Sequence, residues 1–130
     1  MNNHISLRVP GTEDQFLINP YGLLHEQITA SSLVKIDVEG NILDGSPYSV
    51  NRAGFVIHSA IHMARAGPAL RAAHAHGAGA GGFRARLRTP PLNQAAMRFC
   101  SHIGYHDFEG IAQDLDERER IVADLGPTSA

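Results

Sequence analysis

The spacing of apolar residues changes near residue 53, and this change most constrains the fold. Before it, apolar residues recur at every second position; after it, they recur at every third or fourth position. Before that point apolar and polar residues alternate, as Ile5, Leu7 and Val9 do with their neighbours. Alternation with a period of two is typical of a β-strand, and Pro10 followed by Gly11 is typical of a turn that ends one. The chain is therefore predicted to begin with a strand.

Three further segments continue the extended pattern. Residues 15–19 and 33–37 are predicted as the second and third strands, and residues 41–43 as the start of a fourth, after a turn at residues 39–40. The first two strands are expected to pair as an antiparallel hairpin across the polar loop at residues 11–14. Residues 29–32 predict a short helical turn, in which a Thr or Ser hydroxyl caps free amides.

Helical spacing begins at residue 53. Five residues lie three or four apart and so share one helix face: Phe55, His58, Ile61, His62 and Arg65. Residues 114–125 mix apolar residues with acids and arginines, which predicts an amphipathic surface helix that ends at Gly126 and Pro127. Together the segments predict an α/β or α+β layered domain that begins with an antiparallel meander.

The composition indicates an ordinary soluble chain. A hydrophobic fraction of 43% and a charged fraction of 18% fit one globular domain, and a net charge of -2 gives no general attraction to nucleic acid or anionic lipid. The single cysteine, Cys100, cannot form an internal disulfide, so a reducing compartment is expected. Because no apolar run approaches the length of a membrane span and the first residues do not resemble a signal peptide, we expect a cytoplasmic protein without a membrane or nucleic-acid partner.

The segment from Ala66 to Arg88 differs from the rest of the chain. It holds eight alanines, five glycines, four arginines and no acidic residue, and it shows neither period clearly. Such a segment has little to bury and much backbone entropy to lose on ordering. Two interpretations stay open for residues 66–90: a flexible basic insert, or a stretch that is locally out of frame. Alternating arginines at 84, 86 and 88 would also suit a nucleic-acid backbone, although only Phe83 offers a stacking surface.

Several ordered segments carry a resemblance to a known family: Phe16–Leu24, Ile28–Asp37, Gly40–Asn41, Ala53–His62, Tyr105–Gly110 and Leu115–Arg120. From about Asn3 to Gly126 the chain resembles class II aldolase/adducin domains. The resemblance implies a three-layer α/β/α sandwich with a mostly antiparallel central sheet. On this reading residues 1–130 form one partial domain, incomplete at both ends, of a protein that assembles as a homotetramer with active sites between subunits.

The resemblance also implies a divalent metal, commonly zinc. In catalytic members a His-x-His pair and a later histidine bind the metal, which polarises hydroxy-ketone oxygens while a carbon–carbon bond of a sugar phosphate breaks. His74 and His76 match the pair, and alternation on a strand would turn both rings to one face. The third histidine is expected beyond Ala130. The pair stands one residue later than the family spacing, an offset that a local frame slip would produce.

The position of the catalytic acid departs from the family pattern. Catalytic members carry an acid at the position of Gly54, and serines that contact phosphate at the positions of Arg52 and Ala53. An Ala-Gly pair at this place resembles the adducin-like branch. The catalytic set of this chain is therefore expected to be incomplete.

Two loops match the places where family members bind the substrate phosphate. One contains His4 and Ser6, and the other contains Tyr21 and Gly22. Backbone amides and hydroxyls at tight turns can hold an anion, so Ser6, Tyr21 and Gly22 are the candidate phosphate-binding residues. His58 and His62 have a metal-capable spacing, but a structural role is the expected one for both.

Together, the residues and the resemblance predict a protein descended from a divalent-metal-dependent sugar-phosphate aldolase or epimerase and inactive in its present form. The alternative is a non-catalytic, adducin-like interaction module of the cytoskeletal type, which the identities of Ala53 and Gly54 favour.

Overall fold

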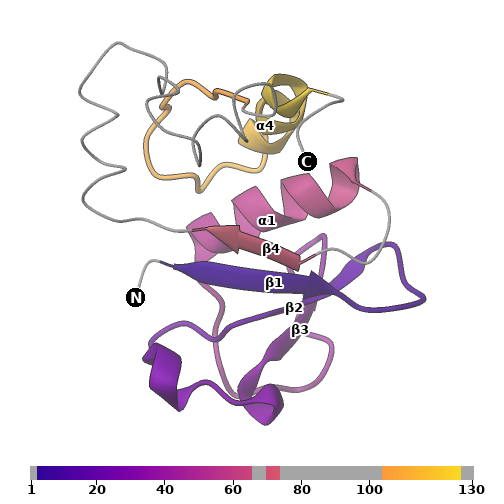
Figure 1. Cartoon of the computed structure of the whole chain (residues 1–130), viewed down its shortest axis with the longest axis vertical. Coiled ribbons are helices and arrows are strands. Elements are labelled where there is room, and N and C mark those ends of the chain that lie inside the picture. Colours follow the sequence, from indigo (N-terminus) through magenta and orange to yellow (C-terminus); the bar gives the residue numbers. More distant parts are fainter. Residues whose placement is uncertain (1–2, 66–69, 74–103, 127–130) are drawn as a thin grey trace, which may run out of the picture.

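Four strands form one antiparallel sheet in the order β3-β2-β1-β4 in the computed structural model, which describes residues 3–65, 70–73 and 104–126 (Figure 1). The strands are β1 (His4–Arg8), β2 (Gln15–Ile18), β3 (Val34–Asp37) and β4 (Leu70–Ala73). The predicted hairpin is confirmed, since β1 and β2 pair antiparallel with Leu7 opposite Leu17. β3 pairs antiparallel with β2, which completes the predicted meander.

The prediction of a fourth strand starting at residue 41 was wrong. Ile42 makes a single isolated bridge to Ile36, and no strand continues from it. The Asp44 carboxylate accepts the amide of Lys35 at 2.9 Å and also the amide of Ser46 at 3.0 Å. Because a side chain satisfies the strand amide and turns the backbone at the same point, the ladder ends there.

Two 3-10 turns, η1 (His25–Gln27) and η2 (Ala30–Ser32), connect β2 to β3. The second is the predicted helical turn. Its Ser32 hydroxyl accepts the amide of Thr29 at 2.9 Å, so a side chain does satisfy a free amide as expected.

Helix α1 (Arg52–Ala64) lies across one face of the sheet and closes the core (Figure 1). Asn51 caps its first turn, because its Oδ1 accepts the amide of Gly54 at 3.1 Å. The buried apolar core is made of Phe16, Ile18, Val34, Ile36, Phe55, Val56 and Ala112. Alternate residues of β2 and β3 thus pack against α1, as their sequence pattern predicts.

Strand β1 turns its polar residues to the core. His4, Ser6 and Arg8 are buried under α1, whereas Ile5 and Leu7 are 40% and 41% exposed. The two apolar side chains instead help to line a groove of about 330 Å³ on the opposite face of the sheet. The buried side of β1 is therefore a polar layer.

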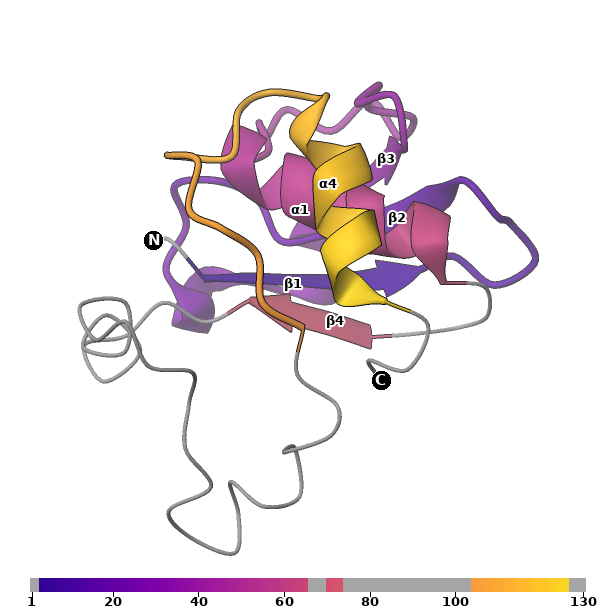
Figure 2. The ribbon, with the colours of Figure 1, turned by 90° about the horizontal axis from the view of Figure 1, so that it is seen from above.

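Helix α4 (Glu117–Leu125) packs on α1, on the side of α1 that is turned away from the sheet (Figures 1 and 2). Arg118 fixes its first turn by donating to the carbonyl of Val38 at 2.8 Å. The helix begins at Glu117 rather than at the predicted residue 114, and it ends at Leu125, followed by the predicted C-terminal glycine, Gly126, with a φ of +60°.

The expected α/β class with an antiparallel sheet is confirmed. Within residues 3–65, 70–73 and 104–126, both α-helices lie on one side of the sheet, so the third layer of the expected sandwich stays a prediction. No helix in the same ranges is long and apolar enough to cross a bilayer.

Candidate functional site

Three segments meet at the start of α1: the first residue of β1, the turn after β2 and the residues that precede the helix. Asn19 joins the turn to β1, because its Oδ1 accepts the amide of Ile5 at 2.8 Å and its own amide donates to the Ile5 carbonyl at 3.3 Å. Tyr21 joins the same turn to the helix cap by donating its amide to the carbonyl of Ser49 at 2.8 Å. These bonds join the Tyr21–Gly22 turn to β1 and to the residues that precede α1.

The geometry of this corner suits an anion. Gly22 has a φ of +93°, a conformation that glycine adopts without strain, and a Cβ there would meet nothing within 4 Å. The first amides of α1 lie at the positive end of the helix dipole, where phosphate groups commonly bind. Arg52 at the first helical position is exposed, with its guanidinium over the Phe55 ring at 5.5 Å. The Arg52 Nε also donates to the carbonyl of Gln113 at 3.3 Å, so the cation at the helix start is directed toward that residue. The corner itself combines a glycine turn with the first amides of the helix.

His4 covers the first turn of α1 from the side of the sheet. Its side chain lies directly over Gly54: a Cβ added to that glycine would sit 2.8 Å from His4 Cγ and Cδ2 and 3.0 Å from Nδ1. His4 is 7% exposed, and neither ring nitrogen has a hydrogen-bond partner among the described residues. Burial lowers the pKa of His4, so the ring is neutral at pH 7. A neutral imidazole can both donate and accept a proton.

Ser6 lies deeper between the sheet and α1. Its Oγ is 2.7 Å from His58 Nδ1 and 2.8 Å from His62 Nε2, and the residue is 1% exposed. Because a hydroxyl carries one proton and two lone pairs, Ser6 can donate to at most one of the two imidazoles and can accept from either. The predicted sharing of one helix face by His58 and His62 is confirmed.

Arg8 continues this polar layer toward the end of α1. Its guanidinium donates to the carbonyls of Glu13 and His62, and to that of Arg65 at 2.9 Å. The last two carbonyls belong to the C-terminal end of the helix, where a cation is favoured by the helix dipole. Three acceptors and the dipole compensate the burial of this charge.

The structure brings some predicted site residues together and separates others. His4 lies over the first turn of α1 and Tyr21 is joined to Ser49 just before the helix, whereas the Ser6 hydroxyl lies between two histidines. A phosphate-binding role for Ser6, Tyr21 and Gly22 stays a prediction. His74 and His76 lie outside the described residues. Within the described ranges, no three His, Cys, Asp or Glu side chains converge as a metal site.

Sequence reasoning missed the coupling between His4 and Gly54, which are fifty residues apart. It treated the missing acid at position 54 and the histidine at position 4 as separate features. The small Ala53–Gly54 pair was the only signal in the sequence that a neighbour comes close to this turn.

Comparison with known proteins gives the same family over the whole chain. The model of the class II aldolase and adducin N-terminal domain matches residues 1–130. A Caulobacter vibrioides protein, provisionally named an aldolase class 2 protein, is 52% identical over 126 residues, covering 95% of this chain and 48% of its own. Rattus norvegicus alpha-adducin is 41% identical over 130 residues, covering 98% of this chain and 17% of its own.

The fold comparison agrees with the sequence comparison. The solved structure of L-fuculose 1-phosphate aldolase from Glaciozyma antarctica PI12 matches with a TM-score of 0.80 and 25% identity, covering 97% of this chain and 49% of that one. The chain thus spans about half the length of these aldolase-type relatives and a smaller part of adducin. It belongs to the class II aldolase and adducin N-terminal domain family.

Proposed function

We propose that the chain binds the phosphate group of a small phosphorylated sugar at the start of α1 and does not cleave a carbon–carbon bond there. The first half of the proposal is supported by the glycine turn at Tyr21–Gly22, by its bond to Ser49 just before α1, and by the positive end of the helix dipole. The name of the Glaciozyma antarctica relative supports a sugar phosphate as the ligand class.

The contact between His4 and Gly54 carries the second half. By resemblance, catalytic members hold a carboxylic acid at the position of Gly54, where it moves a proton. Any side chain at this position needs a Cβ, and the His4 ring leaves no room for one, since the distance would be 2.8 Å. The acid of the family mechanism is therefore sterically incompatible with this site as it is built.

A divalent metal is the further part of the family chemistry. The described residues offer no complete set of ligands for it. We propose His74 and His76 as the two candidate ligands, with zinc as the candidate ion. Metal content of the purified chain, compared with a His74→Ala, His76→Ala variant and a His25→Ala control, tests this assignment. Sequencing the locus across codons 66–90 tests the frame slip that would have displaced the pair.

Binding is tested on the full chain by calorimetric titration with L-fuculose 1-phosphate, with inorganic phosphate as competitor. Gly22→Val should weaken binding at least tenfold, because it places a branched side chain and a strained φ in the turn. Gly45→Val is the matched control, since Gly45 also has a positive φ, of +65°, but lies outside the corner. Equal affinities of the two variants would contradict the proposed site.

Cleavage is tested separately by adding divalent zinc and measuring release of an aldehyde from L-fuculose 1-phosphate. We expect binding without release. Metal-dependent release would overturn the non-catalytic half of the proposal and leave the binding half intact. We also propose that the protein assembles as a homotetramer and is cytoplasmic. Sedimentation velocity measures the number of subunits.

The second candidate function is an adducin-like interaction module. It is favoured by Phe108 and Ile111, which are 80% and 73% exposed on the segment before α4, and by the identity to alpha-adducin. The two functions are separated by a double substitution, Phe108→Ala with Ile111→Ala. Sugar-phosphate binding should survive this change, whereas association with a protein partner should not.

A further inference from the structure

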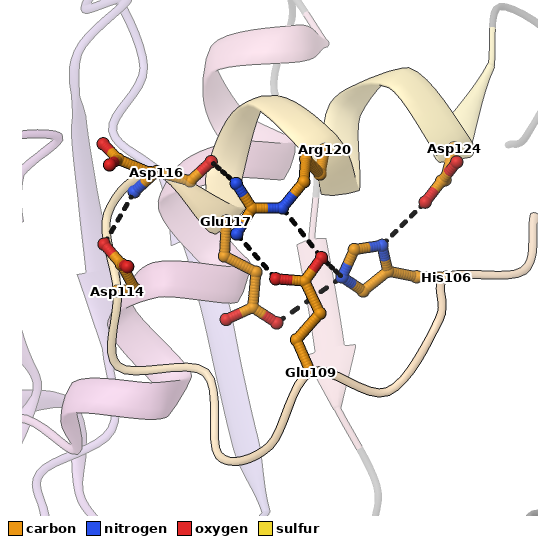
Figure 3. Close-up of polar contacts among 7 residues, drawn as sticks. All are labelled: His106, Glu109, Asp114, Asp116, Glu117, Arg120 and Asp124. Carbon is orange, nitrogen blue, oxygen red and sulfur yellow. Dashed lines mark hydrogen bonds and ion pairs between the residues drawn. The ribbon is translucent and has the colours of Figure 1, made fainter.

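Residues 104–110 contain no helix or strand and lie along α4, where a histidine joins them to the helix (Figure 3). Nδ1 of His106 is 2.7 Å from a carboxylate oxygen of Asp124, near the C-terminal end of α4. Nε2 of the same ring is 3.5 Å from Glu117, in the first turn of α4, and 4.0 Å from Glu109, within the segment itself. Three carboxylates thus surround one imidazole.

Two further contacts hold the segment to the same helix. The Glu109 carboxylate accepts two bonds from the Arg120 guanidinium, at 2.7 and 2.6 Å. At the other end of the segment, a Cβ on Gly104 would meet the Asp124 carbonyl at 2.9 Å, so the backbone of Gly104 lies close against α4. His106 lies between Gly104 and Glu109 in the sequence. Of the charged side chains in this cluster, it is the one that gains or loses its proton near neutral pH.

The charge balance around His106 depends on its proton. Among the described residues, Asp124, Glu117 and Arg120 face it from α4, and Glu109 faces it from its own segment. With His106 protonated, two cations offset two of the three carboxylate charges. With His106 neutral, three carboxylates remain near one arginine, and the last turn of α4 loses a cation that its dipole favours.

We propose that His106 is a proton-dependent latch, which holds residues 104–110 against α4 when it is protonated and releases them when it is neutral. The segment carries the exposed Phe108, and Ile111 follows directly after it. Ala112, the next residue, is buried in the core and limits how far a release can extend. Loss of one proton would thus change how this apolar surface is presented.

The direction of the pH dependence follows from the same contacts. The hydrogen bond that His106 donates to Asp124 raises the pKa of the ring, and the nearby carboxylates of Glu117 and Glu109 act in the same direction, against a smaller opposing effect of burial. A group with a raised folded pKa stabilises the closed form fully below its ordinary value of about 6.5, and this stabilisation is lost as pH rises through the folded pKa. The latch therefore closes in mild acid and opens toward alkaline pH.

The test is hydrogen exchange of the full chain across pH 5 to 9, expressed as protection factors so that the intrinsic pH dependence of exchange is removed. The amides of residues 104–110 should lose protection over the pH range in which the His106 ring titrates by NMR, while the amides of α1 keep theirs. Unchanged protection of the segment through the His106 titration would overturn the proposal.

Substitutions make the test specific. His106→Asn should give low protection of the segment at every pH, whereas His25→Asn, the same change at an exposed histidine outside the cluster, should keep the wild-type profile. If His106→Asn does not fold, Asp124→Asn serves instead, and both the NMR midpoint of His106 and the loss of protection should move to lower pH together. Movement of the midpoint without movement of the protection would also refute the latch.

Discussion

The contact between His4 and Gly54 makes a quantitative prediction about the substitution Gly54→Ala. The added methyl would lie 2.8 Å from two carbons of the His4 ring, inside normal contact distance. The ring cannot easily move away, since His4 is 7% exposed and its edge packs against His58 with ring centroids 5.9 Å apart. Overpacking of this kind costs roughly 1–3 kcal/mol.

A second effect acts in the opposite direction. Alanine is favoured over glycine within a helix by up to about 1 kcal/mol. In the wild-type background, Gly54→Ala should therefore lower the free energy of unfolding by about 0–2 kcal/mol, the difference between the overpacking cost and the helix gain. In a His4→Ala background the clash is gone, and the same substitution should stabilise the chain by roughly 0.5–1 kcal/mol.

Urea unfolding of the full chain, followed by circular dichroism at 222 nm, measures the four members of this double-mutant cycle. The expected coupling between positions 4 and 54 is about 1–3 kcal/mol. A parallel cycle of Gly54→Ala with His25→Ala should show no coupling, because His25 is exposed on η1 and outside the contact. Equal effects of Gly54→Ala in the presence and absence of His4 would refute the steric reasoning.

Four further measurements test other parts of the structure. Ser6→Ala should lower the free energy of unfolding by roughly 2–4 kcal/mol in urea, because two buried imidazoles lose a shared hydroxyl. Phe16→Ala should cost about 3–5 kcal/mol in the same assay, since it empties the core and removes the stack on His62. Asn51→Ala should cost about 1 kcal/mol by thermal melting through loss of the α1 cap. Stability should fall as pH rises through the raised pKa of His106, and Asp124→Asn should flatten this fall in urea titrations at pH 6 and 9.

The alternating pattern of the first half located the strands because β2 and β3 obey the simple rule of one apolar face. Phe16, Ile18, Val34 and Ile36 are all buried on the side of α1. β1 shows the limit of the rule. A period of two defines two faces, but it does not say which face is buried when the polar residues find partners elsewhere in the chain.

The partners of the polar face of β1 are far away in sequence. Ser6 needs His58 and His62, and Arg8 needs carbonyls at the end of α1, more than fifty residues later. Local composition carries no sign of these pairings. The strand at Leu70–Ala73 was missed for a different reason, since its alanines and single leucine lack the branched and aromatic residues that mark a strand.

The candidate site was predictable to the extent that it follows from local turn chemistry and from the family pattern. The Tyr21–Gly22 turn and the start of α1 were both recognised from sequence, and the bond from Tyr21 to Ser49 joins the turn to the residues just before the helix. The relation between His4 and Gly54 could not be recognised in this way, because it is a matter of volume between two segments. From the sequence alone, Gly54 shows only that the acidic residue of the family pattern is missing.

The structure adds a steric reason for the absence of an acid at position 54. If the imidazole of His4 and a side chain at position 54 compete for one space, an acid cannot be restored at position 54 while His4 keeps its place. Gly54→Glu alone should destabilise the chain by at least as much as Gly54→Ala, because the larger side chain begins with the same Cβ. Combined with His4→Ala, the glutamate gains the volume of the ring, and the double variant should be the more stable of the two. A double variant less stable than Gly54→Glu alone would show that His4 supports the turn rather than excluding a side chain from it.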